Sequence, residues 1–177
     1  MKTVPTSLLT AAAFLALTAC QSTGPCIVAP ASEAETAALL GRIKTLEGTW
    51  TSTDESGVTN VAAVFKTVAA GSAVREIMFP GQPYEMTNLY HMDGADLVMT
   101  HYCAAGSQPR MRARTGSEAN VLHFEFDSIT NLHAAEEEYM GSMTLTLVDA
   151  DHARCDWASY KGGERVGTMA FDLTRQK

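Results

Sequence analysis

Apolar and polar residues alternate with a period of two along most of the chain, which is typical of strands that bury one face. Turn residues separate the alternating segments at short and regular intervals, and no helical segments lie between them. The pattern predicts ten strands, at residues 49–53, 59–67, 73–79, 84–92, 95–103, 110–115, 121–127, 142–148, 153–160 and 165–173. We therefore expect an all-β fold, an antiparallel up-and-down β-barrel of about eight to ten strands.

One segment before the strands has a helical period. Ser32 is a suitable N-cap, and the acidic residues Glu33 and Glu35 follow it in the first turn. Apolar residues then recur at helical intervals: Leu39, Leu40, Ile43 and Leu46. This pattern predicts one N-terminal amphipathic helix of about four turns. A second interruption, residues 128–138, carries an acidic run and is expected to be a loop or a helical turn over one end of the barrel.

The dipeptide Asp93-Gly94 predicts a two-residue hairpin turn. In that register Met92 lies opposite Ala95, and Tyr90 lies opposite Leu97. The more apolar face of the hairpin is expected to point into the barrel. That face carries Met86, Asn88, Tyr90, Leu97, Met99, His101 and Cys103.

A second hairpin is predicted at Gly162-Gly163, with Trp157 opposite Thr168. Its interior face would carry Cys155, Trp157, Val166 and Ala170. In segment 73–79 the alternation requires either Arg75 or Glu76 to point inward, and the pattern does not distinguish them.

The N-terminus has the features of an export signal. Lys2 precedes an apolar run at residues 8–16 that is too short to span a bilayer as a helix. The tetrapeptide Leu17-Thr18-Ala19-Cys20 that follows resembles the lipobox of bacterial lipoproteins. The resemblance implies a signal peptide at residues 1–19 and lipidation of Cys20. Residues 20–32 would form a flexible tether, and residues 33–177 the barrel domain. Because Gln21 rather than Asp follows, it also implies a cell-envelope location in the outer membrane, facing the periplasm in a Gram-negative cell.

Composition agrees with a single globular domain. The chain has 177 residues, of which 46% are hydrophobic and 19% charged. Its formal net charge is −7, with no basic cluster, so we expect no nucleic acid partner. The membrane contact would therefore be made through the lipid anchor alone, and we expect a monomer.

Three cysteines remain beyond the lipidation site. Cys26 lies in the tether, which leaves Cys103 and Cys155 as the pair that one disulfide could join in an exported protein. Spacing does not decide whether they meet.

The chain also resembles a larger family. A helix leading into Gly48-Thr49-Trp50, followed by an up-and-down series of strands, is similar to the lipocalin and calycin superfamily, in which this Trp plugs the closed end of the barrel. The segment from Thr100-His101-Tyr102-Cys103 to Gln108-Pro109-Arg110-Met111 resembles more closely a group of uncharacterised bacterial lipocalin-like lipoproteins. In that group the corner usually reads G-N-Q-P-R, whereas Ser107 replaces the Asn here. The resemblance implies a fold and no activity.

The candidate chemistry gathers around residues 97–111, so we expect a small apolar or lipid-like ligand inside the barrel. The ligand-binding residues would be His101, Tyr90, Asn88, Met99, Glu76, Arg110, Gln108 and Trp50. As an alternative, the Gln108-Pro109-Arg110 corner is purely structural, with Arg110 paired to a carboxylate such as that of Glu76. A non-catalytic envelope scaffold, its interior packed shut, is the competing class of function.

Other chemistries are less well supported. His101 and Cys103 share one face, but no third ligand is spaced to complete a metal site, so no metal is expected. Nitrobindin-type barrels bind haem through a histidine and begin with a similar G-x-W. Their glycine-rich opening is missing here, since Thr51-Ser52-Thr53 follows, so haem is the alternative and no cofactor is expected. Cys103 with His101 as base would need a third group to orient the imidazole, and no catalytic residue is assigned.

Overall fold

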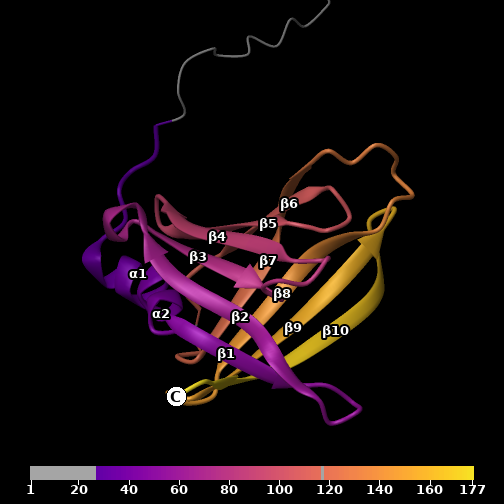
Figure 1. Ribbon diagram of the computed structural model, residues 1–177. Helices are drawn as coiled ribbons and strands as arrows, with labels where there is room; N and C mark the ends of the chain where they lie inside the picture. Colours follow the sequence, from indigo (N-terminus) through magenta and orange to yellow (C-terminus); the bar gives the residue numbers. More distant parts are fainter. Residues whose placement is uncertain (1–26, 117) are drawn as a thin grey trace, which may run out of the picture.

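The fold was analysed in a computed structural model, which describes residues 27–116 and 118–177. Ten antiparallel strands form a closed barrel in which each strand pairs with its sequence neighbours and β1 pairs with β10. Their bounds are β1 Gly48–Thr53, β2 Thr59–Val68, β3 Ala73–Met78, β4 Met86–Asp93, β5 Asp96–Tyr102, β6 Gln108–Ala113, β7 Val121–Thr130, β8 Tyr139–Leu147, β9 His152–Lys161 and β10 Glu164–Arg175. The predicted all-β up-and-down barrel is confirmed (Figure 1).

The N-terminal helical segment forms two short helices instead of the single helix predicted. α1 spans Glu33–Ala38 and α2 spans Leu40–Lys44, and Leu39 between them has φ −117° and ψ −85°. The predicted N-cap is present, because the Ser32 hydroxyl accepts a hydrogen bond from the Glu35 amide and the Glu35 carboxylate bonds back to Ser32. Leu39 and Leu40 are both buried despite the break between them.

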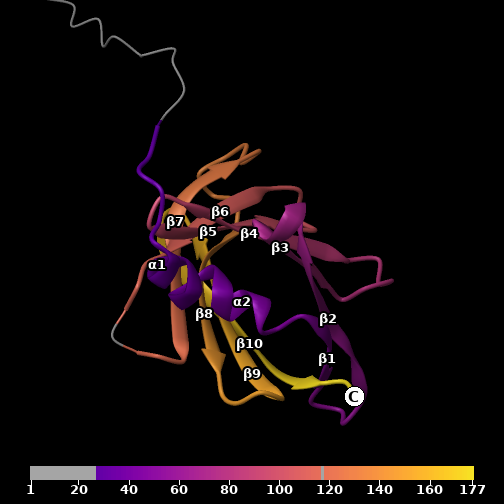
Figure 2. The ribbon, with the colours of Figure 1, turned by 90° about the vertical axis from the view of Figure 1, so that its left-hand side faces the viewer.

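The two helices cover one end of the barrel, as two views at right angles show (Figures 1 and 2). Trp50 is fully buried at this end, and its indole nitrogen donates a hydrogen bond to the Leu46 carbonyl at 2.7 Å. The Arg175 guanidinium lies 4.3 Å from the centre of the Trp50 ring and donates to the carbonyls of Thr45 and Glu47. Trp50, which was predicted to bind the ligand, therefore belongs to the packed closed end and does not line the cavity described below.

The first predicted hairpin has the expected faces but a different register. Asp93 pairs with Asp96, so that Gly94 and Ala95 form the turn, and Asn88 lies opposite His101 rather than Met99. Gly94 has φ +59°, and a Cβ there would lie 3.2 Å from the Ala29 carbonyl oxygen. Because the partner strand is displaced by two residues, every side chain keeps its face, and His101 still points inward.

The second hairpin has the predicted turn, but a β-bulge displaces the rest of its register. Lys161 pairs with Glu164 as expected, the register then shifts between Arg165 and Gly167, and Trp157 lies opposite Met169. The bulge turns Met169, Phe171 and Leu173 toward the interior in place of Val166 and Ala170. The interior position predicted for Val166 and Ala170 is therefore wrong.

The remaining interruption is shorter than expected. Strand β7 continues to Thr130, so residues 128–130 are part of a strand, and the loop comprises residues 131–138. This loop, together with those that follow β1, β3, β5 and β9, lies at the end of the barrel opposite the helices, because the strands alternate in direction. We call this the open end.

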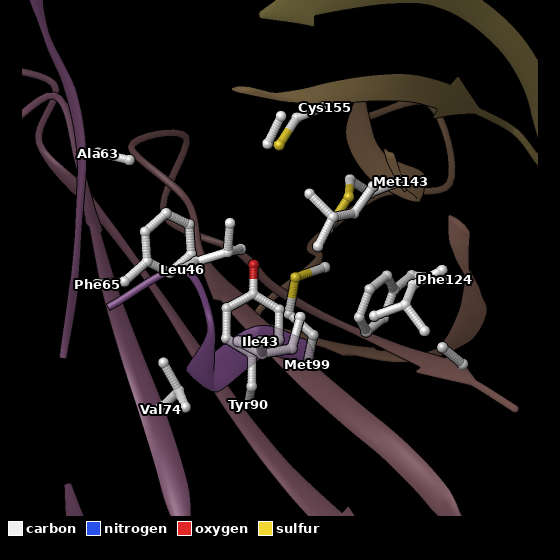
Figure 3. Close-up of a cluster of buried hydrophobic side chains, with 14 of the residues drawn as sticks. Ile43, Leu46, Ala63, Phe65, Val74, Tyr90, Met99, Phe124, Met143 and Cys155 are labelled. Atoms are coloured by element: carbon white, nitrogen blue, oxygen red, sulfur yellow. The ribbon is translucent and has the colours of Figure 1, made fainter. Parts of the chain in front are cut away.

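The interior near the helices is tightly filled. Tyr90, Met99, Phe124 and Met143 meet Ile43 there, and all five side chains are at most 2% exposed (Figure 3). The Tyr90 and Phe124 rings lie 5.9 Å apart in an edge-to-face arrangement. Any ligand site must therefore lie nearer the open end.

Candidate ligand-binding site

A small apolar cavity of about 70 Å³ opens toward the open end of the barrel. Its lining comes from several strands and from the loops after β3 and β5: Met78, Phe79, Met86, His101, Cys103, Met140, Trp157, Met169 and Phe171. Four of these side chains are methionines, which are flexible and adapt their shape to what they contact. The cavity thus combines apolar walls with one imidazole and one indole.

The imidazole of His101 is held by a row of polar residues on three neighbouring strands. Glu76 on β3 lies opposite Asn88 on β4, which lies opposite His101 on β5. The Asn88 amide nitrogen donates to Glu76 Oε2 at 2.7 Å, and Asn88 Oδ1 lies 2.7 Å from His101 Nδ1. All three residues are at most 4% exposed. The row crosses the inner wall of the barrel and ends at the cavity.

This arrangement determines the tautomer of His101. Because the Asn88 amide nitrogen faces the Glu76 carboxyl group, its oxygen faces His101 and can only accept a hydrogen bond. The imidazole proton is therefore on Nδ1, and Nε2 carries a lone pair. Burial lowers the pKa of His101 from 6.5 to about 4, so the ring is neutral at pH 7.

Two buried polar atoms, on residues that line the cavity, have no hydrogen-bond partner among the described residues. They are His101 Nε2, which accepts, and Trp157 Nε1, which donates. The two ring centres lie 5.0 Å apart, at an angle of 49°. Buried polar atoms without a hydrogen-bond partner are rare in folded proteins. A ligand that bonds to both atoms would explain why they lack partners here.

Glu76 resolves the ambiguity that the alternation left in segment 73–79. It is 4% exposed and accepts from Asn88 and from the Tyr90 hydroxyl, the latter at 2.6 Å, whereas Arg75 is exposed. Burial raises the pKa of the Glu76 carboxyl, and burial together with this carboxyl raises the pKa of Tyr90 well above 10. In the described part of the chain no cation pairs with Glu76, so its partners are neutral.

Gln108 and Arg110 do not belong to the interior, which corrects their assignment to the ligand site. The Arg110 guanidinium lies 3.8 Å from Asp127 on the outer wall, while Pro109 and Met111 on either side are buried. The Gln108 side chain donates to the Gly106 carbonyl and accepts from Thr130. The corner therefore has the structural role that was the alternative, with Asp127 as the carboxylate in place of Glu76.

Asn88, Tyr90 and Met99 point inward as predicted but do not line the cavity. Tyr90 and Met99 lie deeper, among the packed side chains of the closed end (Figure 3). Asn88 and Tyr90 can act on a ligand only through the hydrogen bonds that reach His101 and Glu76.

The two cysteines in the described ranges, Cys103 and Cys155, are free thiols and are not joined by the disulfide that the sequence allowed. Cys155 is buried, and burial raises the pKa of its thiol well above 9. Cys103 lines the cavity, but no hydrogen bond joins it to His101 among the described residues, although Asn88 does supply the orienting group for the imidazole. The described chain also holds no cluster of three His, Cys, Asp or Glu side chains placed for a metal ion.

Most of the cavity wall was not recognised as a site from the sequence. Met78 ends β3 and Phe79 follows it, Met140 is the second residue of β8, and Met169 and Phe171 lie on β10 beyond its bulge. The sequence placed Trp157 on the interior face of its hairpin, but not among the ligand-binding residues. Its position opposite Met169 depends on the bulge, which a period of two does not reveal.

A second, larger hollow of about 490 Å³ lies beside the cavity, along the seam between β1 and β10. These strands pair only at Trp50–Arg175 and Thr51–Thr174, so they separate toward the open end. The hollow is lined mainly by polar residues of β1, β2 and the loops, and it shares Phe79 and Phe171 with the cavity. Their rings lie 5.4 Å apart, which places this aromatic pair between the two spaces.

No protein-family model matches the chain, and no curated protein matches it.

Proposed function

We propose that the protein is an exported, lipid-anchored barrel that binds a small, mostly apolar ligand at the open end of its interior. The observation that carries the proposal is the apolar cavity with two partnerless polar atoms, one on His101 and one on Trp157. Small-molecule sites combine apolar walls with a few oriented polar groups in this way.

The size of the cavity limits what enters without movement. About 70 Å³ is less than the roughly 150 Å³ of an engineered cavity that holds benzene. Met169 is 51% exposed at the mouth, and Phe171 lies between the cavity and the larger hollow. Rotation of these side chains would extend the cavity into the hollow, so we expect an elongated ligand with its apolar part in the barrel.

The first experiment is to purify the protein from bacterial envelopes and extract bound molecules for mass spectrometry. We expect a recurrent apolar molecule that is absent from a Trp157→Arg variant, in which a charged side chain would occupy the cavity. The control is Val166→Arg, which places the same charge on the exposed outer face of β10 and should retain the molecule. Equal recovery from all three proteins would contradict the proposal.

Export and anchoring rest on Cys20 and residues 1–19, which lie outside the described residues. In the described ranges no helix is long and apolar enough to cross a membrane. A lipid on Cys20 would hold the barrel at the outer membrane through the tether of residues 20–32.

A scaffold without a ligand is the second candidate, and the packing of the closed end favours it. Tyr90 and Met99, expected to border an open cavity, are shut into the core at 2% and 0% exposure. Only the half of the barrel near the open end retains space, so the extraction experiment distinguishes the two functions.

Haem fits this interior poorly. The lone pair on His101 Nε2 has the right chemistry for an axial ligand, but Met86, Met140 and Phe171 surround a cavity far smaller than a tetrapyrrole. We therefore assign no haem chemistry to the site. Added hemin should give only the broad Soret absorption of free hemin, and a sharpened, shifted band that is lost in His101→Phe would reverse this conclusion.

A further inference from the structure

We propose that the ligand of this cavity carries a hydroxyl group on an apolar body, and that His101 and Trp157 hold this hydroxyl between them. The inference rests on the proposed function and names the chemical class of its ligand. It follows from what each of the two partnerless atoms requires.

The requirement of His101 is set by its neighbours. Since Asn88 Oδ1 accepts the hydrogen bond from Nδ1–H, Nε2 carries only a lone pair and needs a donor, and no described residue supplies one. The ring cannot rotate to offer its N–H instead without breaking the 2.7 Å bond to Asn88, whose amide nitrogen is already bound to Glu76. The row of three polar residues therefore specifies an acceptor at the cavity wall.

Trp157 sets the opposite requirement. Its indole N–H can only donate, so it needs an acceptor, and it is 4% exposed. A hydroxyl is the smallest ligand group that donates and accepts at once. A carboxylate or an ether only accepts, and would leave Nε2 unpaired. An ammonium only donates, and would leave the indole unpaired with a charge in an apolar space.

The other lining atoms do not compete for the hydroxyl. The remaining side chains are methionines and phenylalanines, apart from Cys103, whose thiol is a weak donor and a weak acceptor. One water molecule would also satisfy both rings, and the cavity has room for it. The ligand hydroxyl would take the place of that water, while the apolar body lies along the methionines.

The test compares probes of equal length on the protein purified from bacterial envelopes. The probes are 1-octanol, which donates and accepts, 1-methoxyheptane, which only accepts, and octanoate, an anion. Calorimetry should show 1-octanol binding about 2- to 10-fold tighter than the ether, the effect of one hydrogen bond. Octanoate should bind more weakly than both.

The outcomes separate the two proposals. Equal affinity for the alcohol and the ether would overturn the hydroxyl inference but leave an apolar ligand site. Tighter binding of octanoate would overturn it in favour of an anionic ligand. If no probe binds and an ordered water is the only occupant, the proposed function fails as well.

Nuclear magnetic resonance gives a direct readout on the two atoms. Addition of 1-octanol should shift the ¹⁵N resonance of His101 Nε2 as expected when this nitrogen accepts a hydrogen bond. It should also shift the proton resonance of the Trp157 indole N–H. The ether should shift only the indole proton. A shift of neither resonance during saturable binding would place the ligand elsewhere and overturn the inference.

Two variants test the same point by affinity. His101→Phe should lower the affinity for 1-octanol to that for the ether, whereas Trp157→Phe should weaken both about equally. His123→Phe, on the outer wall of β7, is the matched control and should change neither. If His101→Phe does not fold, the wild-type probe series and the resonance shifts still decide the question.

Discussion

Glu76 is the residue on which the interior polar row depends. It accepts two hydrogen bonds on one oxygen and has no cation beside it in the described chain, so its negative charge is poorly compensated when it ionises. Burial raises the pKa of this carboxyl because ionisation in the barrel interior is unfavourable. The residue therefore maintains the position of Asn88 and the tautomer of His101 at the expense of stability above its ordinary pKa.

Replacing Glu76 by Gln should keep both hydrogen bonds, since the amide oxygen accepts as the carboxyl oxygen does. A group whose pKa is raised on folding loses stabilisation as pH rises, so Glu76→Gln should be more stable than wild type at about pH 8. The advantage should shrink as pH falls toward about 4.5 and be absent below it, where the carboxyl is protonated in both the folded and the unfolded chain. Urea denaturation at several pH values measures both.

Glu76→Leu is the matched comparison, because it removes the acceptor and leaves the Asn88 amide and the Tyr90 hydroxyl without partners. We expect it to lower the free energy of unfolding by about 2–4 kcal/mol. A Leu variant as stable as the Gln variant would mean that the row contributes nothing to folding.

His101 should give the opposite dependence on pH. Its pKa is lowered on folding from 6.5 to about 4, so the unfolded chain binds a proton that the folded protein does not. Its contribution to stability is complete above 6.5 and falls as pH drops toward 4, by about 2 kcal/mol at pH 5. Denaturation of wild type and His101→Gln at about pH 7.5 and pH 5 should show this loss only in wild type. Parallel losses would contradict the assignment.

At the scale of elements, the β-bulges decide which side chains form the cavity wall. The register of β8 shifts at Gly141 and that of β10 shifts immediately before Gly167, and both strands pair with β9. A Cβ on Gly141 would overlap the ring of Tyr160, and one on Gly167 would lie 2.7 Å from Ser159 Oγ. These glycines let the neighbouring strand approach where the register changes.

Gly141→Ala should therefore lower the free energy of unfolding by about 2–3 kcal/mol, the usual cost of overpacking. Tyr160→Leu in the same chain should recover much of that loss by opening the space, and the double-mutant cycle measures the coupling. Gly163→Ala is the control, with no atom within 4 Å of its Cβ and a cost limited to its backbone at φ +83°. Equal costs at both glycines without rescue would show that the Tyr160 contact is unimportant.

At the scale of the whole molecule, the barrel has one filled half and one half with space. The helices, Trp50 and Arg175 close one end, while β1 and β10 separate toward the other. The ends have different roles, since the first supplies most of the packed core and the second carries both hollows. A ligand at the open end would leave the packed half undisturbed.

Anchoring is also a property of the whole protein. In a bacterial host, the wild-type chain should partition into detergent and carry the added mass of a diacylglyceryl-modified cysteine. Cys20→Ser should lack that mass and leave the detergent phase. Cys26→Ser, in the same tether, is the control and should behave as wild type. A Cys20→Ser protein that stays lipidated would refute the proposed anchor.

The chain by itself determined the strands and the inward face of the Asp93-Gly94 hairpin, because alternation and turn chemistry are local. Alternation also predicted that Asn88 and His101 share the interior face, although it did not predict that they lie opposite each other. Only the tertiary structure decided the break at Leu39, the choice of Glu76 over Arg75, the outward Arg110 and the bulge that places Met169 opposite Trp157. Those depend on contacts between strands distant in sequence, where closing the barrel and filling its interior outweigh the local period.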